Sequence, residues 1–183
     1  MIGGTARGRA LKAPVSSSVR PTSARAREAI FDALGAIVSL EGAIVLDLFS
    51  GSGALGIEAL SRGAVSVTFV DNDRSALDFV ETNLASTGLG QPGSGAVTRL
   101  VRREALTYLA NSGHFDLAFI DPPYRFDSWA KVFEHLDADI AVLESNAAIE
   151  PRGAYSLYRS YKYGGTLVHI VKRQPDSEAA SAS

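Results

Sequence analysis

The chain has 183 residues, of which 46% are hydrophobic and 21% charged, with a formal net charge of −2 and no cysteine. This length is typical of one domain with its own core. The absence of cysteine excludes a disulfide scaffold, a thiolate-ligated metal centre and a cysteine nucleophile. No apolar run approaches the ~20 residues of a membrane-spanning helix, and the first residues lack the apolar stretch of a signal peptide. We therefore expect a cytoplasmic protein with no membrane partner.

The charges are unevenly distributed along the chain. Residues 1–27 contain six Lys or Arg and no acid, residues 151–175 contain five and no acid, and acids predominate between these segments. Two basic ends on an acidic body predict a localised anion-binding surface, provided that the ends meet in the folded molecule. The alternative is that these bases only keep two edge segments soluble.

The N-terminal segment is expected to form a small extension. Residues 1–12 predict two short strands in a hairpin around Ala6-Arg7-Gly8, and residues 13–21 predict a loop. A helix is expected to begin at Thr22 or Ser23, where a hydroxyl can cap its first amides, and to end at Gly35 or Gly42. Apolar residues at helical spacing predict its buried face: Ala26, Ala29, Ile30, Ala33, Leu34 and Ile37.

From residue 43, short apolar runs alternate with helical segments. Strands are predicted at 43–48, 66–70, 96–101, 115–120 and 140–143, and helices at 54–61, 74–86, 105–111 and 129–136. The strand runs are continuously apolar, so we expect a parallel sheet that is covered by helices on both faces. Residues 155–163 and 166–173, on either side of a Gly-Gly pair, predict an antiparallel hairpin at the sheet edge.

Together these elements predict a doubly wound, Rossmann-like α/β fold with a mostly parallel sheet and an antiparallel edge hairpin. We expect the N-terminal extension to comprise residues 1–38 and the main domain residues 39–173. Residues 174–183 are small and polar and predict a disordered tail. The three histidines are scattered without ligand spacing, so no metal site is expected.

A glycine-rich turn follows the first predicted core strand. Gly51, Gly53 and Gly56 satisfy the G-x-G-x-x-G pattern, in which the backbone can approach a ligand closely at the start of a helix. The next strand ends at Asp71, where a carboxylate can accept hydrogen bonds from two ribose hydroxyls. Both NAD and S-adenosylmethionine (SAM) fit this arrangement. Asp47 favours SAM, because an acid suits a cationic amino acid moiety better than a pyrophosphate; the alternative is that Asp47 caps the amides of the turn.

A second motif, Asp121-Pro122-Pro123-Tyr124, follows the strand predicted at 115–120 and therefore lies at the same carboxyl edge of the sheet. The prolines stiffen this turn and offer carbonyls without amide donors. Acceptors beside an aromatic ring suit a planar base that carries an exocyclic amino group. The alternative is a rigid loop without a ligand.

The motifs resemble those of a known family. Residues 121–124 match the (Asp/Asn)-Pro-Pro-(Tyr/Phe) signature of SAM-dependent methyltransferases that act on amino nitrogens, and residues 47–53 match their SAM-binding motif. A wider pattern is formed by Ile2-Gly3-Gly4, Arg7-Gly8-Arg9, Arg20-Pro21-Thr22, Arg27-Glu28, Phe31 and residues 51–63. Over residues 2–173 the chain thus resembles the bacterial small-subunit ribosomal RNA guanine-N2 methyltransferases, the RsmD-like family. It departs from the family pattern at Glu104, where Asp or Asn is frequent, and at Ala24, where an acid is frequent.

This resemblance implies a seven-strand class I SAM-dependent methyltransferase fold and methylation of the guanine 2-amino group in 16S rRNA. The substrate would be the 30S subunit or an assembly intermediate, and we expect a monomer. The residues implied at the cofactor are Arg20, Thr22, Asp47, Phe49, Ser50, Gly51, Gly53, Asp71, Asn72, Glu104 and Ala105. The guanine would be held by Asp121, Pro122, Pro123 and Tyr124, and the RNA contacted by Arg7, Arg9, Lys12, Arg25 and Arg125.

Direct in-line attack of the amine on the sulfonium methyl is expected, because the covalent route used for ring carbons requires a cysteine. Four other functions remain open on the sequence. They are an adenine-N6 methyltransferase acting on DNA or RNA, a protein-glutamine methyltransferase, a catalytically silent SAM- or RNA-binding assembly factor, and an NAD dehydrogenase. The first would need a DNA-reading domain or an RNA substrate, and the second usually has Asn in place of Asp121. The dehydrogenase leaves the Asp-Pro-Pro-Tyr turn unexplained.

Overall fold

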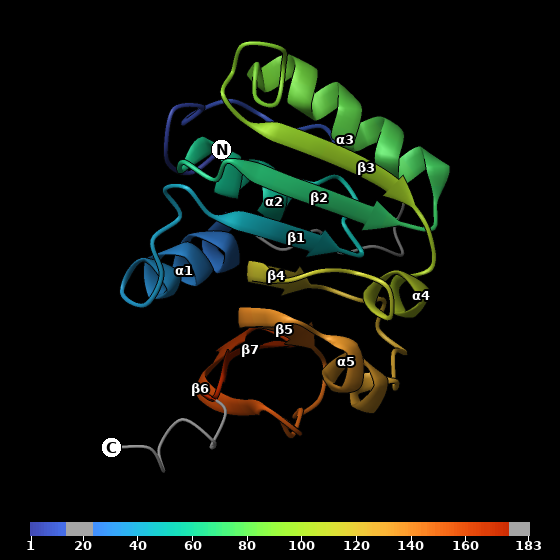
Figure 1. Ribbon diagram of the computed structural model, residues 1–183. Helices are drawn as coiled ribbons and strands as arrows, with labels where there is room; N and C mark the ends of the chain where they lie inside the picture. Colours follow the sequence, from blue (N-terminus) through green and yellow to red (C-terminus); the bar gives the residue numbers. More distant parts are fainter. Residues whose placement is uncertain (14–23, 176–183) are drawn as a thin grey trace, which may run out of the picture.

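A seven-stranded sheet forms the centre of the molecule, in the order β3-β2-β1-β4-β5-β7-β6 (Figure 1). It is seen in a computed structural model that describes residues 1–13 and 24–175. The strands are β1 (Ile44–Leu48), β2 (Ser66–Asp71), β3 (Val97–Arg102), β4 (Phe115–Ile120), β5 (Ala138–Ser145), β6 (Tyr155–Tyr163) and β7 (Thr166–Arg173). β1 to β5 pair in parallel, whereas β7 runs antiparallel to both β5 and β6. The predicted mostly parallel sheet with an antiparallel edge hairpin is thus confirmed.

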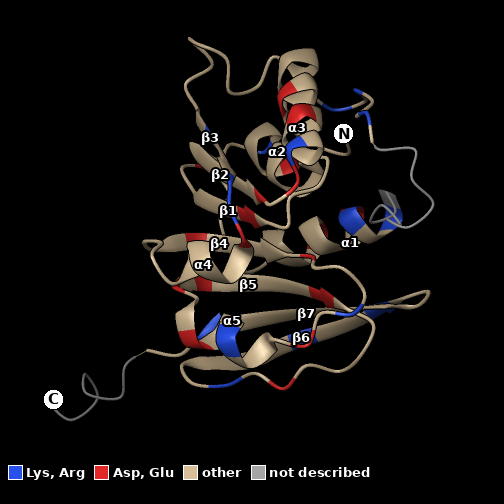
Figure 2. Ribbon diagram, turned by 90° about the vertical axis from the view of Figure 1, so that its right-hand side faces the viewer, with Lys and Arg blue, Asp and Glu red and all other residues tan. Residues whose placement is uncertain are grey.

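Helices cover both faces of the sheet and form two cores (Figures 1 and 2). On one face lie α1 (Ala24–Gly35), α2 (Ala54–Ser61) and α3 (Arg74–Thr87), and their apolar side chains pack on alternate residues of the strands, such as Val45 and Phe119. On the other face lie α4 (Ala105–Leu109) and α5 (Trp129–His135), packed on Leu46 and Ile120 among others. None of the described helices is long and apolar enough to cross a membrane.

The outermost parallel strand is more exposed than the sequence predicted. We expected all the apolar runs of the sheet to be buried on both faces, and β1, β2, β4 and β5 are largely buried. In β3, however, Val97 is 56% exposed and Leu100 38% exposed. β3 is an edge strand with only β2 as a neighbour, so less of its surface is covered. The expectation of burial on both faces was wrong for β3.

The N-terminal segment does not form the predicted hairpin. Residues 1–13 contain turns and no strand, and their amides bond mainly to α2. The carboxylate of Glu58, which is fully buried, accepts from Ile2 N at 2.9 Å and Gly3 N at 2.7 Å. Thr5 N donates to the Ser61 carbonyl at 2.8 Å. These acceptors on α2 bind the amides that a partner strand would bind in a hairpin, and they hold the segment against the helix.

Some expectations fall on residues that the structure does not describe. The loop after residue 13, the capping hydroxyls of Thr22 and Ser23, and the tail beyond Pro175 lie outside the described residues. At the end of the last strand, Gln174 N still donates to the Ala154 carbonyl at 2.7 Å. This hydrogen bond continues the contact between the two strands one residue past the end of β7 at Arg173.

The strand order determines where a ligand can bind. The chain leaves β1 towards β2 and β3 on one side and returns to β4 and β5 on the other, so the order reverses between β1 and β4. Crevices at the carboxyl ends of strands flanking such a reversal are where open α/β sheets bind ligands. The glycine-rich turn follows β1 and the Asp-Pro-Pro-Tyr turn follows β4. Both predicted motifs therefore lie at this position.

Candidate active site

The glycine-rich turn after β1 has an unusual backbone. Gly51 and Gly53 have φ angles of 52° and 75°, in the left-handed region that favours glycine. Phe49, with a φ of 60°, is the one non-glycine residue with a positive φ among the described residues. A side chain in this conformation costs of order 1–3 kcal/mol, and such strain concentrates at functional sites. A Cβ atom on Gly53 would lie 3.0 Å from a Val80 methyl, so the loop is also closely packed against α3.

The carboxylate of Asp71 anchors this turn. Its Oδ2 accepts from Gly51 N and its Oδ1 from Asp73 N, each at 2.9 Å. Asp71 is half-buried at the carboxyl end of β2, so part of each oxygen faces outward from the sheet edge. The adjacent Asn72 is exposed, and its carbonyl accepts from Arg102 Nε at 3.3 Å. The predicted cofactor residues Asp71 and Asn72 thus lie beside the glycine turn.

Asp47 is the buried acid of the site. Its Oδ2 accepts from Gly56 N in the first turn of α2 at 2.9 Å, so the carboxylate caps this helix. Burial, together with the smaller effects of the charges of Asp121 and Asp71, raises the pKa of Asp47 to about 8 against the opposing Gly56 hydrogen bond. Three carboxylates from β1, β2 and the β4 end therefore meet at one edge of the sheet. A cation bound here would relieve their mutual repulsion.

This environment predicts a pH-dependent stability. The folded-state pKa of Asp47, about 8, lies above its ordinary value of 3.8. The stability that the protonated form of Asp47 contributes is therefore complete below pH 3.8 and is lost as the pH rises through 8. Relative to Asp47→Asn, the free energy of unfolding of the wild-type chain should fall by up to about 1.4 kcal/mol per pH unit over this interval. Urea unfolding of both proteins from pH 5 to 8 measures this difference. A difference that stays constant with pH would contradict the assignment.

The Asp-Pro-Pro-Tyr turn continues directly from β4. Asp121 N lies 3.5 Å from the Leu48 carbonyl, which extends the pairing of β4 with β1 up to the turn. The Pro123 carbonyl accepts from Phe126 N at 2.9 Å, whereas the Pro122 carbonyl accepts no hydrogen bond from the described residues. Tyr124 is 51% exposed. The turn therefore presents a carboxylate, a carbonyl and an exposed aromatic ring at the sheet edge.

Aromatic side chains connect the two turns. The ring of Phe49 packs against Phe126, with centroids 5.4 Å apart, and Phe126 packs edge-on against Trp129 at 5.1 Å. Trp129 thus packs with its helix against the second core. The contribution of Phe126 was not predicted, because nothing in its local sequence indicates that it would contact residue 49. The contact fixes the strained Phe49 relative to the segment after Tyr124.

Glu104 has a structural role that the sequence did not predict. As the N-cap of α4, its carboxylate accepts from Leu106 N at 3.0 Å and from Thr107 N at 2.8 Å. Although partial burial raises it, these hydrogen bonds keep the pKa of Glu104 below its ordinary value. Ala105 is buried beneath it. Both residues follow β3 at the carboxyl edge, and their contact with an adenine ring stays a prediction.

Basic residues of several elements lie along one side of the sheet. Figure 2 shows the basic residues of the N-terminal segment, of α1 and of the β6–β7 hairpin along the same side of the sheet. All five predicted RNA-binding residues are exposed: Arg7, Arg9, Lys12, Arg25 and Arg125. Arg9 also donates to the Ser86 carbonyl at 2.7 Å. Arg20 and Thr22, which were expected at the cofactor, lie outside the described residues.

Asn83 links the N-terminal segment to the glycine-rich turn. This fully buried side chain accepts from Lys12 N at 2.8 Å and donates to the Lys12 carbonyl at 2.8 Å and the Ser52 carbonyl at 2.9 Å. Sequence reasoning missed this residue. The available signal was its position on the apolar face of α3, between the buried Val80 and Thr87.

Replacing Asn83 by alanine should therefore destabilise the fold, because it leaves three backbone groups without their partner. We expect a loss of at least about 2 kcal/mol in the free energy of unfolding. Urea denaturation measures this loss. Asn111→Ala is the matched control, since the exposed side chain of Asn111, just after α4, donates only to the Thr107 carbonyl, and its loss should change stability by less than about 0.5 kcal/mol. Equal stabilities of the two variants would show that the link contributes nothing.

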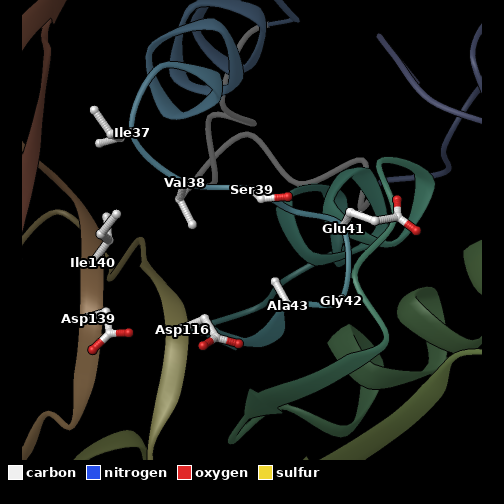
Figure 3. Close-up of a pocket in the computed structure, with 9 residues that line it drawn as sticks. All are labelled: Ile37, Val38, Ser39, Glu41, Gly42, Ala43, Asp116, Asp139 and Ile140. Carbon is white, nitrogen blue, oxygen red and sulfur yellow. The ribbon is translucent and has the colours of Figure 1, made fainter.

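A hollow at the opposite edge of the sheet has a different character. It has a volume of about 320 Å³ and lies at the amino ends of β1, β4 and β5, where Figure 3 shows Asp116 and Asp139 on neighbouring strands. His114 joins these two acids, with ligand atoms of all three within 4.8 Å of one another, although the histidines were predicted to be scattered. Hydrogen bonding to Asp137 raises the pKa of His114. This edge carries neither the glycine turn nor the Asp-Pro-Pro-Tyr turn.

Comparisons with known proteins agree with this geometry. The model of the family described as "Conserved hypothetical protein 95" matches residues 1–171. The Escherichia coli (strain K12) protein "Ribosomal RNA small subunit methyltransferase D" is 33% identical over 98% of this chain and 92% of its own length. The Bacillus subtilis protein "Putative rRNA methyltransferase YlbH" is 35% identical over 95% of this chain and 98% of its own.

A solved structure is similar over the same extent. "Putative methyltransferase yhhF from Escherichia coli" has a TM-score of 0.81 and 33% identity, covering 96% of this chain and 98% of its own. The sheet described above is therefore that of a class I methyltransferase, as the resemblance implied. The chain belongs to the "Conserved hypothetical protein 95" family, that of the ribosomal RNA small subunit methyltransferase D proteins.

Proposed function

We propose that the chain transfers a methyl group from SAM to the exocyclic N2 amino group of a guanine in 16S rRNA of the small ribosomal subunit. The observation that carries this proposal is that the two turns lie side by side: Asp121 N is 3.5 Å from the Leu48 carbonyl at the end of β1, and the rings of Phe49 and Phe126 pack at 5.4 Å. A methyl acceptor held by Asp121 would lie beside a cofactor held by that turn. The name of the Escherichia coli relative supports rRNA of the small subunit as the substrate class.

The residues present fit SAM better than a dinucleotide. SAM carries a sulfonium and an ammonium group, which suit the carboxylates of Asp71 and Asp121 and would favour ionisation of Asp47, whereas a pyrophosphate would be repelled there. The hydroxyl of Ser50 is buried in the glycine turn without a hydrogen-bond partner among the described residues, and a polar ligand group would satisfy it. Asp71 would hold the ribose, and the glycine turn the methionine part. When bound, SAM supplies an electrophilic methyl group.

The Asp-Pro-Pro-Tyr turn would activate the amine by positioning it. The lone pair of an exocyclic amine is delocalised into the ring, so it is a poor nucleophile. Hydrogen bonds from the amino group to the Asp121 carboxylate and the Pro122 carbonyl would reduce this delocalisation and stabilise the positive charge that develops on nitrogen. Holding the amine in line with the methyl group can lower the activation free energy by roughly 7–11 kcal/mol. The Asp121 carboxylate can then accept the proton that the methylated amino group releases.

The target base must leave its stack to reach this turn. Extrusion of a base costs a few kcal/mol, and stacking on the exposed ring of Tyr124 would offset part of that cost. The neighbouring Arg125 is exposed and can contact the phosphates beside the flipped nucleotide. Phosphate contacts by Arg7, Arg9, Lys12 and Arg25 would orient the substrate.

Methyl transfer from labelled SAM tests the proposal. The substrates are 30S subunits that lack the modification, naked 16S rRNA and DNA, each incubated with the purified chain. We expect label in the rRNA of the subunits. Label in DNA or in ribosomal protein would keep the methyl-transfer chemistry and overturn the substrate. Tight SAM binding without transfer to any substrate would favour a silent assembly factor.

A further inference from the structure

The face of the edge hairpin carries a group of cations and aromatic rings that the proposed site does not use. Tyr158 is 43% exposed, and the Lys172 ammonium lies over its ring at 4.4 Å from the centroid. The Arg159 guanidinium lies 5.9 Å from the ring centroids of both Tyr158 and Tyr161 and donates to the Tyr161 hydroxyl at 3.3 Å. The rings of Tyr161 and Tyr163 stack at 6.1 Å.

A β-bulge brings these side chains onto one face. The β6–β7 pairing shifts between Leu157 and Arg159, so Tyr158 is an extra residue on β6. Without a bulge, adjacent residues of a strand point to opposite faces. Here the Arg159 guanidinium and the Lys172 ammonium both approach the ring of Tyr158, so the bulge has turned this ring to the face of its neighbours. We call the group Tyr158, Arg159, Tyr161 and Lys172 the β6–β7 platform.

The cations of the platform have no carboxylate partner. Among the described residues, ion pairs join Arg62 to Glu58, Arg74 to Asp78 and Arg173 to Asp137, whereas neither Arg159 nor Lys172 forms one. The charge of Asp32 on the neighbouring α1 acts on Tyr163 at the border of the platform. Cations that alternate with the exposed ring of Tyr158 and the half-buried ring of Tyr161 match single-stranded nucleic acid, in which phosphates alternate with bases.

The platform extends from the level of Asp121 towards the amino edge of the sheet. Through the strand pairings, Ile120 at the end of β4 is level with Leu143, His169 and Ser160 on successive strands. Asp121 is therefore level with Tyr161, three strand spacings away, or about 14 Å. Arg159 is level with Phe119, and Lys172 with Leu117, so the rest of the platform continues along β6 and β7 away from that level. An RNA segment with its target base at Asp121 can reach the platform with a few flanking nucleotides. The basic N-terminal segment and α1 lie on the same side of the sheet (Figure 2).

We propose that the β6–β7 platform binds a single-stranded RNA segment flanking the methylated nucleotide, with a base stacked on Tyr158 and phosphates held by Arg159 and Lys172. This inference rests on the proposed function for the identity of the RNA. It extends that function from the target base to its neighbours. It also explains why an edge strand keeps an exposed tyrosine beside two cations that have no acidic partner.

Fluorescence anisotropy with a labelled single-stranded RNA of about a dozen nucleotides tests the platform in the full chain. Tyr158→Leu keeps an apolar side chain and removes the ring, and it should raise the RNA Kd about 5- to 100-fold. Arg159→Ala should lower the slope of log Kd against log salt by about 0.7. Lys162→Ala is the matched control, because Lys162 is exposed on the same strand but points to the opposite face. It should change the Kd less than about twofold.

Three outcomes would overturn the inference: wild-type affinity of Tyr158→Leu, an equal loss in Lys162→Ala, or a photo-crosslinker at position 158 that labels ribosomal protein instead of rRNA. Thermal melts of each variant establish that it is folded. Failure of the proposed function is distinguishable. A wild-type chain that methylates rRNA while Tyr158→Leu binds RNA normally overturns the platform alone, whereas platform-dependent RNA binding without methyl transfer overturns the function alone.

Discussion

Asp121→Ala is expected to lower kcat for methyl transfer by about 10²–10³-fold, because it removes the acceptor that stabilises charge developing on the amine. The SAM Kd should change less than about fivefold, since Asp121 acts on the cofactor site only through its charge. Steady-state kinetics with the RNA substrate and equilibrium dialysis of SAM measure the two quantities separately. Asp121→Asn, which keeps one acceptor oxygen, should have an intermediate kcat.

Asp127→Ala provides the matched control for this experiment. Asp127 is an exposed carboxylate in the segment after the turn, and it accepts only from Ser128 Oγ at 3.1 Å. Its replacement should leave kcat within about twofold of the wild-type value. A wild-type kcat in Asp121→Ala would remove Asp121 from the reaction and with it the assignment of the turn as the base-binding element.

Asp71→Ala is expected to raise the SAM Kd about 100-fold. The carboxylate would hold two ribose hydroxyls, and each hydrogen bond to a charged group contributes roughly 1.5–3 kcal/mol. The substitution also releases Gly51 N, so the turn loses an anchor on its ligand side. Isothermal titration calorimetry measures the change. At saturating SAM, kcat should recover to near the wild-type value, because Asp71 does not contact the amine.

Asp73→Ala separates cofactor binding from helix capping. Asp73 accepts from Ser75 N at 2.9 Å as the N-cap of α3 and lies two residues from Asp71. Its loss should lower the stability through the lost helix cap while leaving the SAM Kd within about threefold. If Asp71→Ala and Asp73→Ala weaken SAM binding equally, the effect of Asp71 would be an indirect one through the loop.

The central elements could be predicted from the sequence because their signals are local. α3 occupies Arg74–Thr87 between the Asp73 cap and Gly88, whose φ of 71° ends the helix, against a predicted 74–86 closed by the same glycine. Strands β4, β6 and β7 have the predicted bounds. Continuous apolar runs between glycines and caps require no information from distant residues, which is why they were identified correctly.

The errors arose where distant residues decide the outcome. The turn residues near Gly4 and Gly8 are equally compatible with a hairpin, and the acceptors that select another conformation, Glu58 and Ser61, are more than 50 residues away. A Cβ atom on Gly4 would lie 1.6 Å from the Ser61 carbonyl oxygen, so this close approach requires glycine. The exposure of β3 likewise follows from its place at the sheet edge, which no local pattern reveals.

The candidate site was predictable in its residue types but not in its interactions. The glycine turn, Asp71 and the Asp-Pro-Pro-Tyr turn could be placed at one edge, because parallel strands end together. The mutual influence of Asp47, Asp71 and Asp121 depends on burial and distance. The same is true of the amide link from Lys12 through Asn83 to Ser52. For Asp47 the structure shows the capping alternative, because its carboxyl group accepts from Gly56 N at the start of α2, whereas its role towards a cationic cofactor stays a prediction.

The most direct test of the central claim is the identity of the methylated nucleoside. The rRNA labelled by the wild-type chain in 30S subunits is digested to nucleosides, which are separated and compared with standards, beside a reaction with Asp121→Ala. The account predicts that the label is in N2-methylguanosine with the wild-type chain and is absent with Asp121→Ala. Label in N6-methyladenosine would contradict it, because the base held by the Asp-Pro-Pro-Tyr turn would then be adenine.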